Sequence, residues 1–144
     1  MSLLKIARTP PITVLPDASV EDVVAVMIQE RSGAVVVVEE HCPKGIFTAH
    51  DLLHRVAGDK IDMASTPVSS VMTSPVKVVN ETTSGKEALA LMLSNKFHHL
   101  VIVDDSCHIL GMVSTNRLLH HLVEGLTDEL DSLDAYICAD GPGG

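Results

Sequence analysis

Two segments of this 144-residue chain recur in the same order about 65 residues further on. The segment 19–27 (SVEDVVAVM) returns as 84–92 (SGKEALALM), and 45–54 (GIFTAHDLLH) returns as 111–120 (GMVSTNRLLH). The offset is 65 for the first pair and 66 for the second, so the extra residue falls in the connection between them, where turns tolerate insertions. A unit of about 60 residues cannot bury its apolar faces alone, so the two copies are expected to pack into one module.

Each copy carries the pattern of a β-α-β-β-α unit. Short runs rich in β-branched residues predict three strands in each copy, because they are too brief for buried helices. These runs are 12–15, 34–38 and 45–48 in the first copy and 76–79, 100–103 and 110–114 in the second. Capping residues Ser19 and Ser84 predict one helix in each copy, and a closing helix is predicted from Thr48 and Ser114. The predicted fold class is therefore α/β (α+β), with two pseudo-symmetric β-α-β-β-α repeats packed sheet to sheet and helices outside.

The repeats also divide the chain. Repeat one is predicted at 8–57, a polar linker at 58–70 and repeat two at 71–124. Residues 125–144 are predicted to be an acidic, partly flexible C-terminal tail. Within that tail, residues 126–135 are expected to extend the last helix, and 140–144 to form a flexible end.

Charge and cysteine content narrow the class of protein. The formal net charge of −9 argues against a nucleic-acid partner, because binding a phosphate backbone needs a basic surface. The apolar runs are short, so no segment is expected to cross a membrane. Cys42, Cys107 and Cys138 form an odd set without CxxC spacing, which favours free thiols in a reducing compartment. The protein is therefore predicted to be cytoplasmic.

Three features together resemble a known family. They are the repeated β-α-β-β-α order, the strand-to-helix junction Gly-Ile-Phe-Thr-Ala-His-Asp at 45–51, and the lead-in Val-Met-Thr-Ser-Pro at 71–75. Over residues 8–124 the chain resembles a tandem pair of CBS (cystathionine-β-synthase) domains, the Bateman module. The resemblance implies a regulatory protein that binds an adenosine-containing ligand between its repeats. The ligands it implies are AMP, ADP, ATP, S-adenosylmethionine and NAD, with no cofactor required.

The first predicted nucleotide site centres on the helix start at Thr48. A hydroxyl beside unpaired N–H groups at the positive end of a helix can hold an anion, and the Asp51 carboxylate can accept hydrogen bonds from a ribose. The resemblance implies these roles for both residues, and the alternative is a plain capping box. It also implies that Lys96, His98 and His99 reach the phosphates, with purely structural histidines as the alternative. The full predicted set is Ile12, Thr13, Thr48, His50, Asp51, Lys96, His98, His99 and Leu100.

The second copy departs from this pattern. Ser114 keeps the hydroxyl, but Arg117 stands where the ribose carboxylate is expected. A guanidinium only donates hydrogen bonds, so it can hold a phosphate but cannot accept from a diol. The second site is therefore predicted to be weak or empty, and the alternative is that Arg117 is an ordinary solvated residue. The predicted degenerate set is Arg31, Val78, Ser114, Asn116 and Arg117.

The remaining motifs favour binding over catalysis. The sequence has no GxSxG, P-loop or GxGxxG motif, so no enzyme activity is predicted. The His50–His54 spacing alone is weak support for zinc, so no metal site is predicted, and Cys42 and Cys107 are interpreted as turn thiols. A homodimer is expected, formed through apolar helix faces that carry Val23, Met27, Ala88 and Met92. The output then goes to an unknown effector protein; the alternative function is a ligand-free scaffold that acts through dimerisation.

Overall fold

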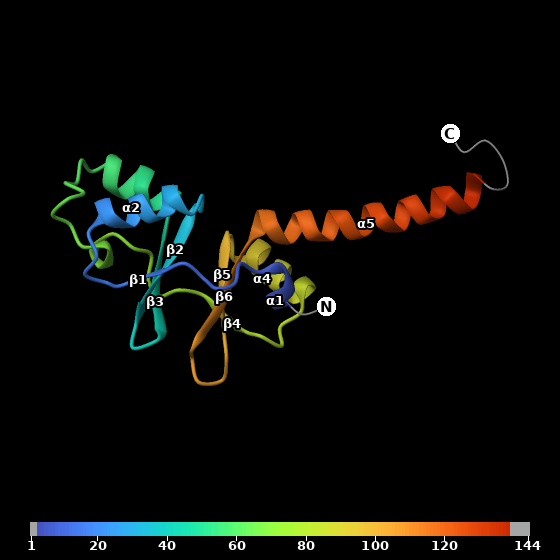
Figure 1. Cartoon of the computed structure of the whole chain (residues 1–144), viewed down its shortest axis with the longest axis horizontal. Helices are drawn as coiled ribbons and strands as arrows, with labels where there is room; N and C mark the ends of the chain where they lie inside the picture. Colours follow the sequence, from blue (N-terminus) through green and yellow to red (C-terminus); the bar gives the residue numbers. More distant parts are fainter. Residues whose placement is uncertain (1–2, 139–144) are drawn as a thin grey trace.

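A computed structural model of the chain describes residues 3–138, with side chains as far as residue 126. It contains two copies of a strand-helix-strand-strand-helix unit, preceded by a short N-terminal helix (Figure 1). The first unit comprises β1 (Thr13–Val14), α2 (Val20–Gln29), β2 (Ala34–Glu39), β3 (Cys42–Thr48) and α3 (Ala49–Asp51), which continues as the π-helical η1 (Leu52–Ala57). The second comprises β4 (Val78–Asn80), α4 (Gly85–Asn95), β5 (His99–Val103), β6 (Ile109–Ser114) and α5 (Thr115–Cys138). Helix α1 (Leu3–Ile6) precedes the first unit, and the 3₁₀ turn η2 (Val68–Ser70) precedes the second.

The two units build matching three-stranded sheets. Their strand orders are β1-β2-β3 and β4-β5-β6, each with one parallel and one antiparallel pair. Thr13 lies opposite Val36 in the first sheet and Val78 opposite Val101 in the second, so both partners shift by 65 residues. The repeat predicted from the sequence is therefore a structural repeat.

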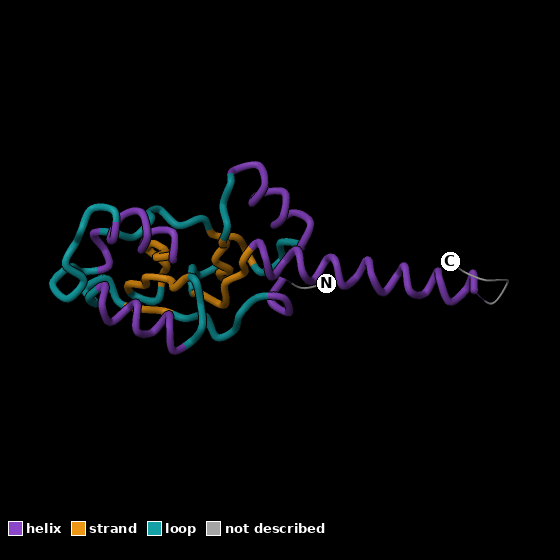
Figure 2. The backbone as a smooth tube through the Cα atoms, turned by 90° about the horizontal axis from the view of Figure 1, so that it is seen from above, coloured by secondary structure: helices purple, strands orange, loops and turns teal. Residues whose placement is uncertain are grey.

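The sheets pack face to face, with helices on the outside (Figure 2). Between the sheets lies one apolar cluster, to which both repeats contribute alternate strand residues. It consists of Ala34, Val36, Ile46, Val101, Val103 and Met112. Each sheet also packs its other face on its own helices, with Val35, Val37 and Phe47 fully buried in repeat one and Leu100, Ile102 and Val113 in repeat two. This confirms the predicted fold class of two repeats packed sheet to sheet.

The segment that precedes each repeat in sequence, its lead-in, packs on the core of the other repeat, so the two lead-ins are exchanged. Helix α1 buries Leu3 and Ile6 in the core of repeat two, and η2 buries Val68 in the core of repeat one. Each lead-in then pairs with a strand of the repeat on which it packs. Arg8 exchanges two backbone hydrogen bonds with Met112, and Thr73 does the same with Ile46. The predicted sequence boundaries remain a prediction; in space, each core includes the segment that precedes the other repeat.

The exchanged lead-ins explain why glycine occupies the first position of the repeated junction, at 45 and 111. A Cβ added at Gly45 would lie 2.9 Å from the Thr73 carbonyl oxygen, and one at Gly111 would lie 2.9 Å from the Thr9 side chain. Such distances are shorter than van der Waals contact, so both positions need glycine for the lead-in to approach the strand.

Two predictions are wrong. Val23, Met27, Ala88 and Met92 are buried in the cores of their own repeats, because the apolar stripe of each helix faces its own sheet. They are therefore not available as a dimer face.

The second error concerns the cysteines. Cys42 and Cys107 are joined by a disulfide, so they are not free turn thiols. The predicted reducing compartment loses this support, and the cytoplasmic location stays a prediction.

The ends of the elements differ slightly from the predicted bounds. β1 and β4 are shorter than predicted, and β3 begins at Cys42, three residues early, because β2 and β3 are joined by the two-residue turn Glu40-His41. α5 continues through 126–135 as predicted and ends at Cys138; the predicted flexible end at 140–144 lies outside the described residues. Among residues 3–138, no helix combines the length and the apolar composition needed to span a bilayer.

Candidate functional site

A cavity of about 710 Å³ lies between the repeats. Its walls are the strand ends, the helix starts that follow them and the two exchanged lead-ins. Of the first predicted set it is lined by Thr48, His50, Asp51, Lys96, His98 and His99, and of the second by Arg31, Ser114, Asn116 and Arg117. The two predicted sites are therefore parts of one continuous cavity.

The junction at the end of β3 places Thr48 and Asp51 on the cavity wall. Thr48 has extended backbone and caps α3: its Oγ1 accepts from the Asp51 N–H at 3.1 Å, while the Asp51 carboxylate accepts from the Thr48 N–H at 3.1 Å and from the Thr48 hydroxyl at 3.2 Å. This is the reciprocal capping box that the sequence offered as the alternative. The capping box fixes the side chains of Thr48 and Asp51 at the N-terminus of α3.

The Asp51 carboxylate also faces the lead-in of repeat two. Its Oδ1 accepts a hydrogen bond from the Thr73 hydroxyl at 3.0 Å and lies 3.6 Å from the Arg55 Nε, and the residue is only 3% exposed. A carboxylate has about four acceptor positions, and three are used here. A ribose hydroxyl can therefore bind Oδ1 beside or in place of Thr73.

Arg117 has a different surrounding from Asp51. Its N–H donates to the Ser114 Oγ at 3.1 Å, and its guanidinium donates from Nε to the Ile6 carbonyl at the end of α1. Arg117 is thus neither a plain solvated residue nor an equivalent of Asp51. It ties α1 to repeat two and still presents a positive charge to the cavity.

The entry of β5 contributes the basic segment. Lys96 ends α4 in the left-handed conformation at φ 57°, His98 is exposed and His99 is half-buried. Burial lowers the pKa of His99, the neighbouring His98 lowers it further, and Asp51 acts in the opposite direction. His99 is therefore held toward its neutral form in the free protein, and a nearby anion would reverse that tendency.

Positive charge is concentrated in this cavity. Five of the ten Lys and Arg residues of the chain line it, although the whole chain carries a formal charge of −9. They are Arg8, Arg31, Lys77, Lys96 and Arg117. Of the described residues along its wall, Asp51 alone is acidic. Low-dielectric walls of one sign attract ions of the opposite sign, so the cavity suits an anion.

Four predicted site residues do not line the cavity. Leu100 is fully buried in the core of repeat two, because alternate residues of β5 face opposite sides of the sheet. Ile12 packs against the core of repeat one, Thr13 is exposed on β1, and Val78 is 37% exposed on β4. None of the four is among the residues along the cavity wall.

Several lining residues were missed by the sequence reasoning. Arg8 and Thr73 enter through the exchanged lead-ins, whose partners lie far away in sequence, and Lys77 follows the second lead-in. Phe97 also lines the cavity and is 38% exposed. Its place inside the Lys-Phe-His-His run was the one signal that pointed to it.

The described residues also bear on metal binding. Among them, no group of three or more His, Cys, Asp or Glu side chains is arranged to hold a metal ion. The His50 and His54 rings lie 4.2 Å apart as a neighbouring pair on one helix.

Comparison with known proteins gives a consistent result. The sequence model of the CBS domain matches the chain twice, at residues 4–58 and 68–124. The mitochondrial CBS domain-containing protein CBSX3 of Arabidopsis thaliana is 33% identical over 126 residues, which cover 84% of this chain and 61% of that protein. The CBS domain-containing protein YhcV of Bacillus subtilis is 32% identical over 119 residues, 82% of this chain and 84% of that protein. The chain thus spans less than two thirds of the length of the Arabidopsis relative.

Solved structures share the fold. A CBS domain protein from Pyrobaculum aerophilum complexed with AMP superposes with a TM-score of 0.75 at 20% identity, covering 86% of this chain and 99% of that one. The CBS domain pair of protein MJ0100, in complex with 5′-methylthioadenosine and S-adenosyl-L-methionine, gives 0.76 at 21% identity and covers 87% and 97%. At these identities, the two structures show a common architecture.

Proposed function

This chain belongs to the CBS domain family as a tandem pair, and from that premise we propose that it is a regulatory module that binds an adenosine-containing ligand in the cavity between its repeats. Relatives of the same fold carry AMP in one structure and 5′-methylthioadenosine with S-adenosylmethionine in another. The bound state would be read by a partner protein, because a regulatory module acts through the protein that it controls.

The concentration of positive charge in the cavity carries this proposal. Five Lys and Arg residues line the cavity in a chain of net charge −9. Arg8 is paired with Glu30 at 3.1 Å, and the remaining positive charge along the wall favours an anion in the space. Basic side chains and helix starts both bind phosphate through charge-assisted hydrogen bonds. We therefore favour a ligand with phosphate, of the AMP, ADP, ATP or NAD type, over S-adenosylmethionine.

The rest of the cavity suits a nucleoside. Asp51 supplies a fixed carboxylate for a ribose diol, and Ile46, Val76 and Met112 give an apolar wall against which a base can lie. Lys96 and His98 also line the cavity, and both are exposed, so their side chains can turn toward a phosphate.

The competing function is a scaffold that keeps the fold without a ligand. The capping box at Thr48 and Asp51 supports it, because that pair stabilises α3 whether or not a ligand binds. The two functions differ in one measurable respect, which is ligand-induced stabilisation.

A thermal-shift panel with AMP, ADP, ATP, S-adenosylmethionine and NAD tests the proposal. A ligand at 100 times its dissociation constant stabilises the folded state by about 2.7 kcal/mol, which is readily seen. If none of the five raises the melting temperature, the scaffold function is the better one.

A matched pair of variants then places the ligand. Lys96 and Lys60 both have left-handed backbone, at φ 57° and 54°, and both are exposed, but Lys60 is not a cavity residue. Lys96→Ala and Lys60→Ala should therefore change stability alike. Lys96→Ala alone should weaken binding of a phosphate-containing ligand; equal affinities of the two variants would place the phosphate elsewhere.

A further inference from the structure

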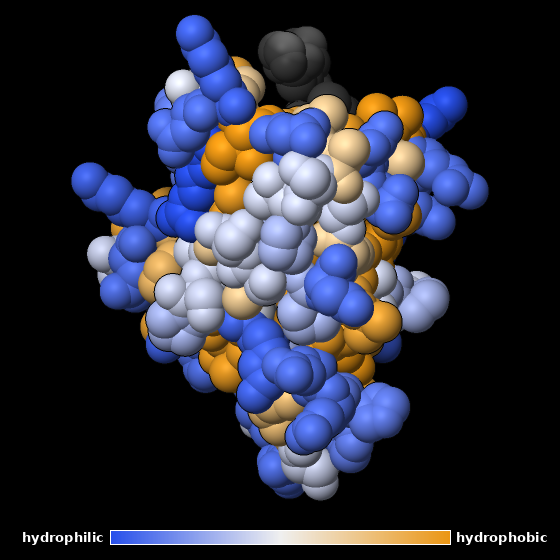
Figure 3. Space-filling view, turned by 90° about the vertical axis from the view of Figure 1, so that its left-hand side faces the viewer, coloured by the Kyte–Doolittle hydropathy of each residue, from blue (hydrophilic) through white to orange (hydrophobic). Residues whose placement is uncertain are grey.

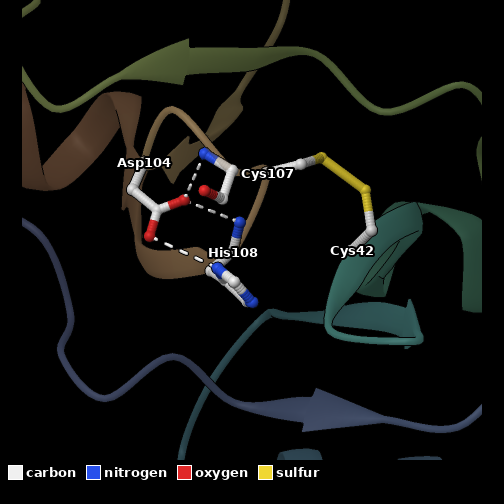
Figure 4. The surroundings of a disulfide bond; sticks show 5 residues. Cys42, Asp104, Cys107 and His108 are labelled. Carbon is white, nitrogen blue, oxygen red and sulfur yellow. Dashed lines mark hydrogen bonds and ion pairs between the residues drawn. A yellow bond between two sulfur atoms is a disulfide. The ribbon is translucent and has the colours of Figure 1, made fainter.

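The disulfide between Cys42 and Cys107 joins the two repeats at equivalent positions. Cys42 opens β3 directly after the Glu40-His41 turn, and Cys107 lies in the connection between β5 and β6. Their Cα atoms are 5.5 Å apart, although 65 residues separate them in sequence. Figure 4 shows the bond bridging the two hairpin tips, beside the Asp104–His108 pair. Because the separation of 65 residues is also the offset between the repeats, the two cysteines occupy equivalent positions. The disulfide therefore links the two pseudo-symmetric halves.

Each bonded cysteine begins a segment that leads to the cavity. β3 runs from Cys42 to Thr48, and β6 runs from just after Cys107 to Ser114; both far ends line the cavity. Strands rise about 3.3 Å per residue, so the bond lies about 20 Å from those ends. Both hairpins point the same way, away from α2 and the start of α5 (Figure 1).

The contact that the bond reinforces is one of apolar side chains. Between the sheets, Val36, Val101 and their neighbours form an apolar layer, which allows small rotations because it has no directional bonds. At the hairpin tips, the disulfide and the His41 and His108 rings, whose centroids are 5.8 Å apart, add contacts across the repeats. A covalent bond there fixes the angle between the sheets, and thereby the width of the cavity.

The surroundings of the bond allow it to react. Both cysteines are half-buried at a hairpin tip, and the adjacent His41 and His108 are exposed, so a small thiol can approach. The Asp104 carboxylate accepts from the His108 N–H at 2.9 Å, and its other oxygen lies 3.5 Å from the His108 Nδ1, which positions that ring beside Cys107 in the chain. A half-buried disulfide at a hairpin tip can be reached by the thiolate of a small molecule, which is the first requirement for exchange.

We propose that Cys42 and Cys107 form a reversible thiol–disulfide site that sets the affinity of the cavity for its ligand, an inference that rests on the proposed function. The co-reactant is a dithiol or glutathione. Its thiolate attacks one sulfur, the Cys42–Cys107 bond breaks, and a mixed disulfide forms. The second thiol of the dithiol, or a second molecule of glutathione, then attacks the mixed disulfide and releases the reduced protein. The cysteines gain two electrons and two protons, and the co-reactant leaves as its disulfide.

The oxidised form is the tighter binder. With the tips joined, the walls of the cavity are held in place before binding, so the ligand does not have to order them. Reduction frees the hairpins and adds that ordering cost. Coupling between sites in proteins is typically about 5- to 150-fold in affinity, so reduction should weaken binding by at least about fivefold.

Calorimetry with each of the five panel ligands tests the proposal on the full chain carrying Cys138→Ser, which removes the third thiol. Titrations are run on the air-oxidised protein and on protein reduced with dithiothreitol, and free thiols are counted by alkylation and mass spectrometry. The variant Cys42→Ser/Cys107→Ser, in the same background, should bind like the reduced protein and should not respond to dithiothreitol.

The outcomes separate the two proposals. Tighter binding by the oxidised form, lost in the double variant, supports the thiol–disulfide site. Equal affinity of the two forms, or two free thiols at positions 42 and 107 in the oxidised sample, overturns the site and leaves the proposed function standing. If neither form binds any of the five panel ligands, the proposed function itself fails, and the regulation of that binding fails with it.

Discussion

At the scale of single residues, Asp51 combines a structural and a proposed binding role. Its carboxylate accepts from the Thr48 N–H, the Thr48 hydroxyl and the Thr73 hydroxyl in a buried position. Asp51→Asn keeps the size but replaces one acceptor by a donor, so we expect the free energy of unfolding to fall by about 2 kcal/mol. We also expect at least a tenfold loss of affinity for a ribose ligand, because each charge-assisted hydrogen bond contributes about 1.5–3 kcal/mol.

Thr73→Val is the matched control for that experiment. It removes the hydrogen bond to Asp51 Oδ1 but keeps the carboxylate, so stability should fall by about 1 kcal/mol while ligand affinity stays within about threefold. Urea unfolding and calorimetry give the two readouts. If both variants lose affinity in proportion to their loss of stability, Asp51 acts on the ligand only through the fold.

His99 gives a prediction about acid sensitivity. Burial lowers its pKa in the folded protein, whereas in the unfolded chain the ring has a pKa of about 6.5. As the pH falls through this range, the unfolded chain takes up a proton that the folded chain resists, so stability is lost toward acidic pH. We expect urea midpoints to fall between pH 7.5 and 5.5, and His99→Gln to reduce that fall.

Ligand binding should reverse the behaviour of the same ring. A phosphate near His98 or His99 raises the pKa in the complex, so binding takes up a proton and affinity for AMP should increase as the pH falls from 8 to 6. The phosphate of AMP also ionises near pH 6 and acts in the opposite direction, so the reference is His98→Gln/His99→Gln. Adenosine, which lacks phosphate, should show no such dependence. The same pH dependence in wild type and double variant would make both histidines structural.

At the scale of elements, what could be predicted from the sequence depends on how local each cause is. The strands and the α3 start could be predicted, because alternation and the Thr48–Asp51 capping box involve residues a few positions apart. The exchange of the lead-ins could not, since α1 packs on strands about a hundred residues later. The disulfide was missed for the same reason: no local motif reveals that two cysteines 65 residues apart meet at neighbouring hairpin tips.

The same reasoning separates the predicted site residues that line the cavity from those that do not. His98 and His99 line the cavity because the helix end at Lys96 directs the chain there, whereas Leu100, one residue further along β5, points to the core. The sequence pattern identified the segment, but the strand register decides which of its side chains reach the cavity.

The N-terminal helix provides a test of the exchange. Leu3 is fully buried against repeat two, while the adjacent Leu4 is only half-buried. Leu3→Ala should lower the free energy of unfolding by about 3 kcal/mol, and Leu4→Ala by about 1 kcal/mol. Both are measured by urea unfolding of the full chain. A cost for Leu3→Ala no larger than that for Leu4→Ala would show that α1 does not pack into repeat two in solution.

At the scale of the whole molecule, exposed apolar residues on the helices are related by the repeat. Ile28 on α2 and Leu93 on α4 are 73% and 64% exposed and differ by 65 residues; Leu53 on η1 and Leu119 on α5 are 64% and 40% exposed and differ by 66. Figure 3, which faces the end of the molecule formed by repeat one, shows apolar side chains at the surface between polar ones. A surface with approximate twofold repetition suits a self-complementary contact.

We therefore expect a homodimer through these four positions, in place of the buried residues predicted from the sequence. Light scattering at micromolar concentration should give twice the 15.4 kDa of one chain. The fourfold variant Ile28→Glu/Leu53→Glu/Leu93→Glu/Leu119→Glu should be monomeric and still folded, because all four side chains are already exposed to solvent in one chain. Leu15→Glu is the control: Leu15 is 61% exposed but lies outside the helices, so its substitution should leave the dimer intact. A wild-type mass of one chain, or a dimer that survives the four glutamates, would rule out this interface.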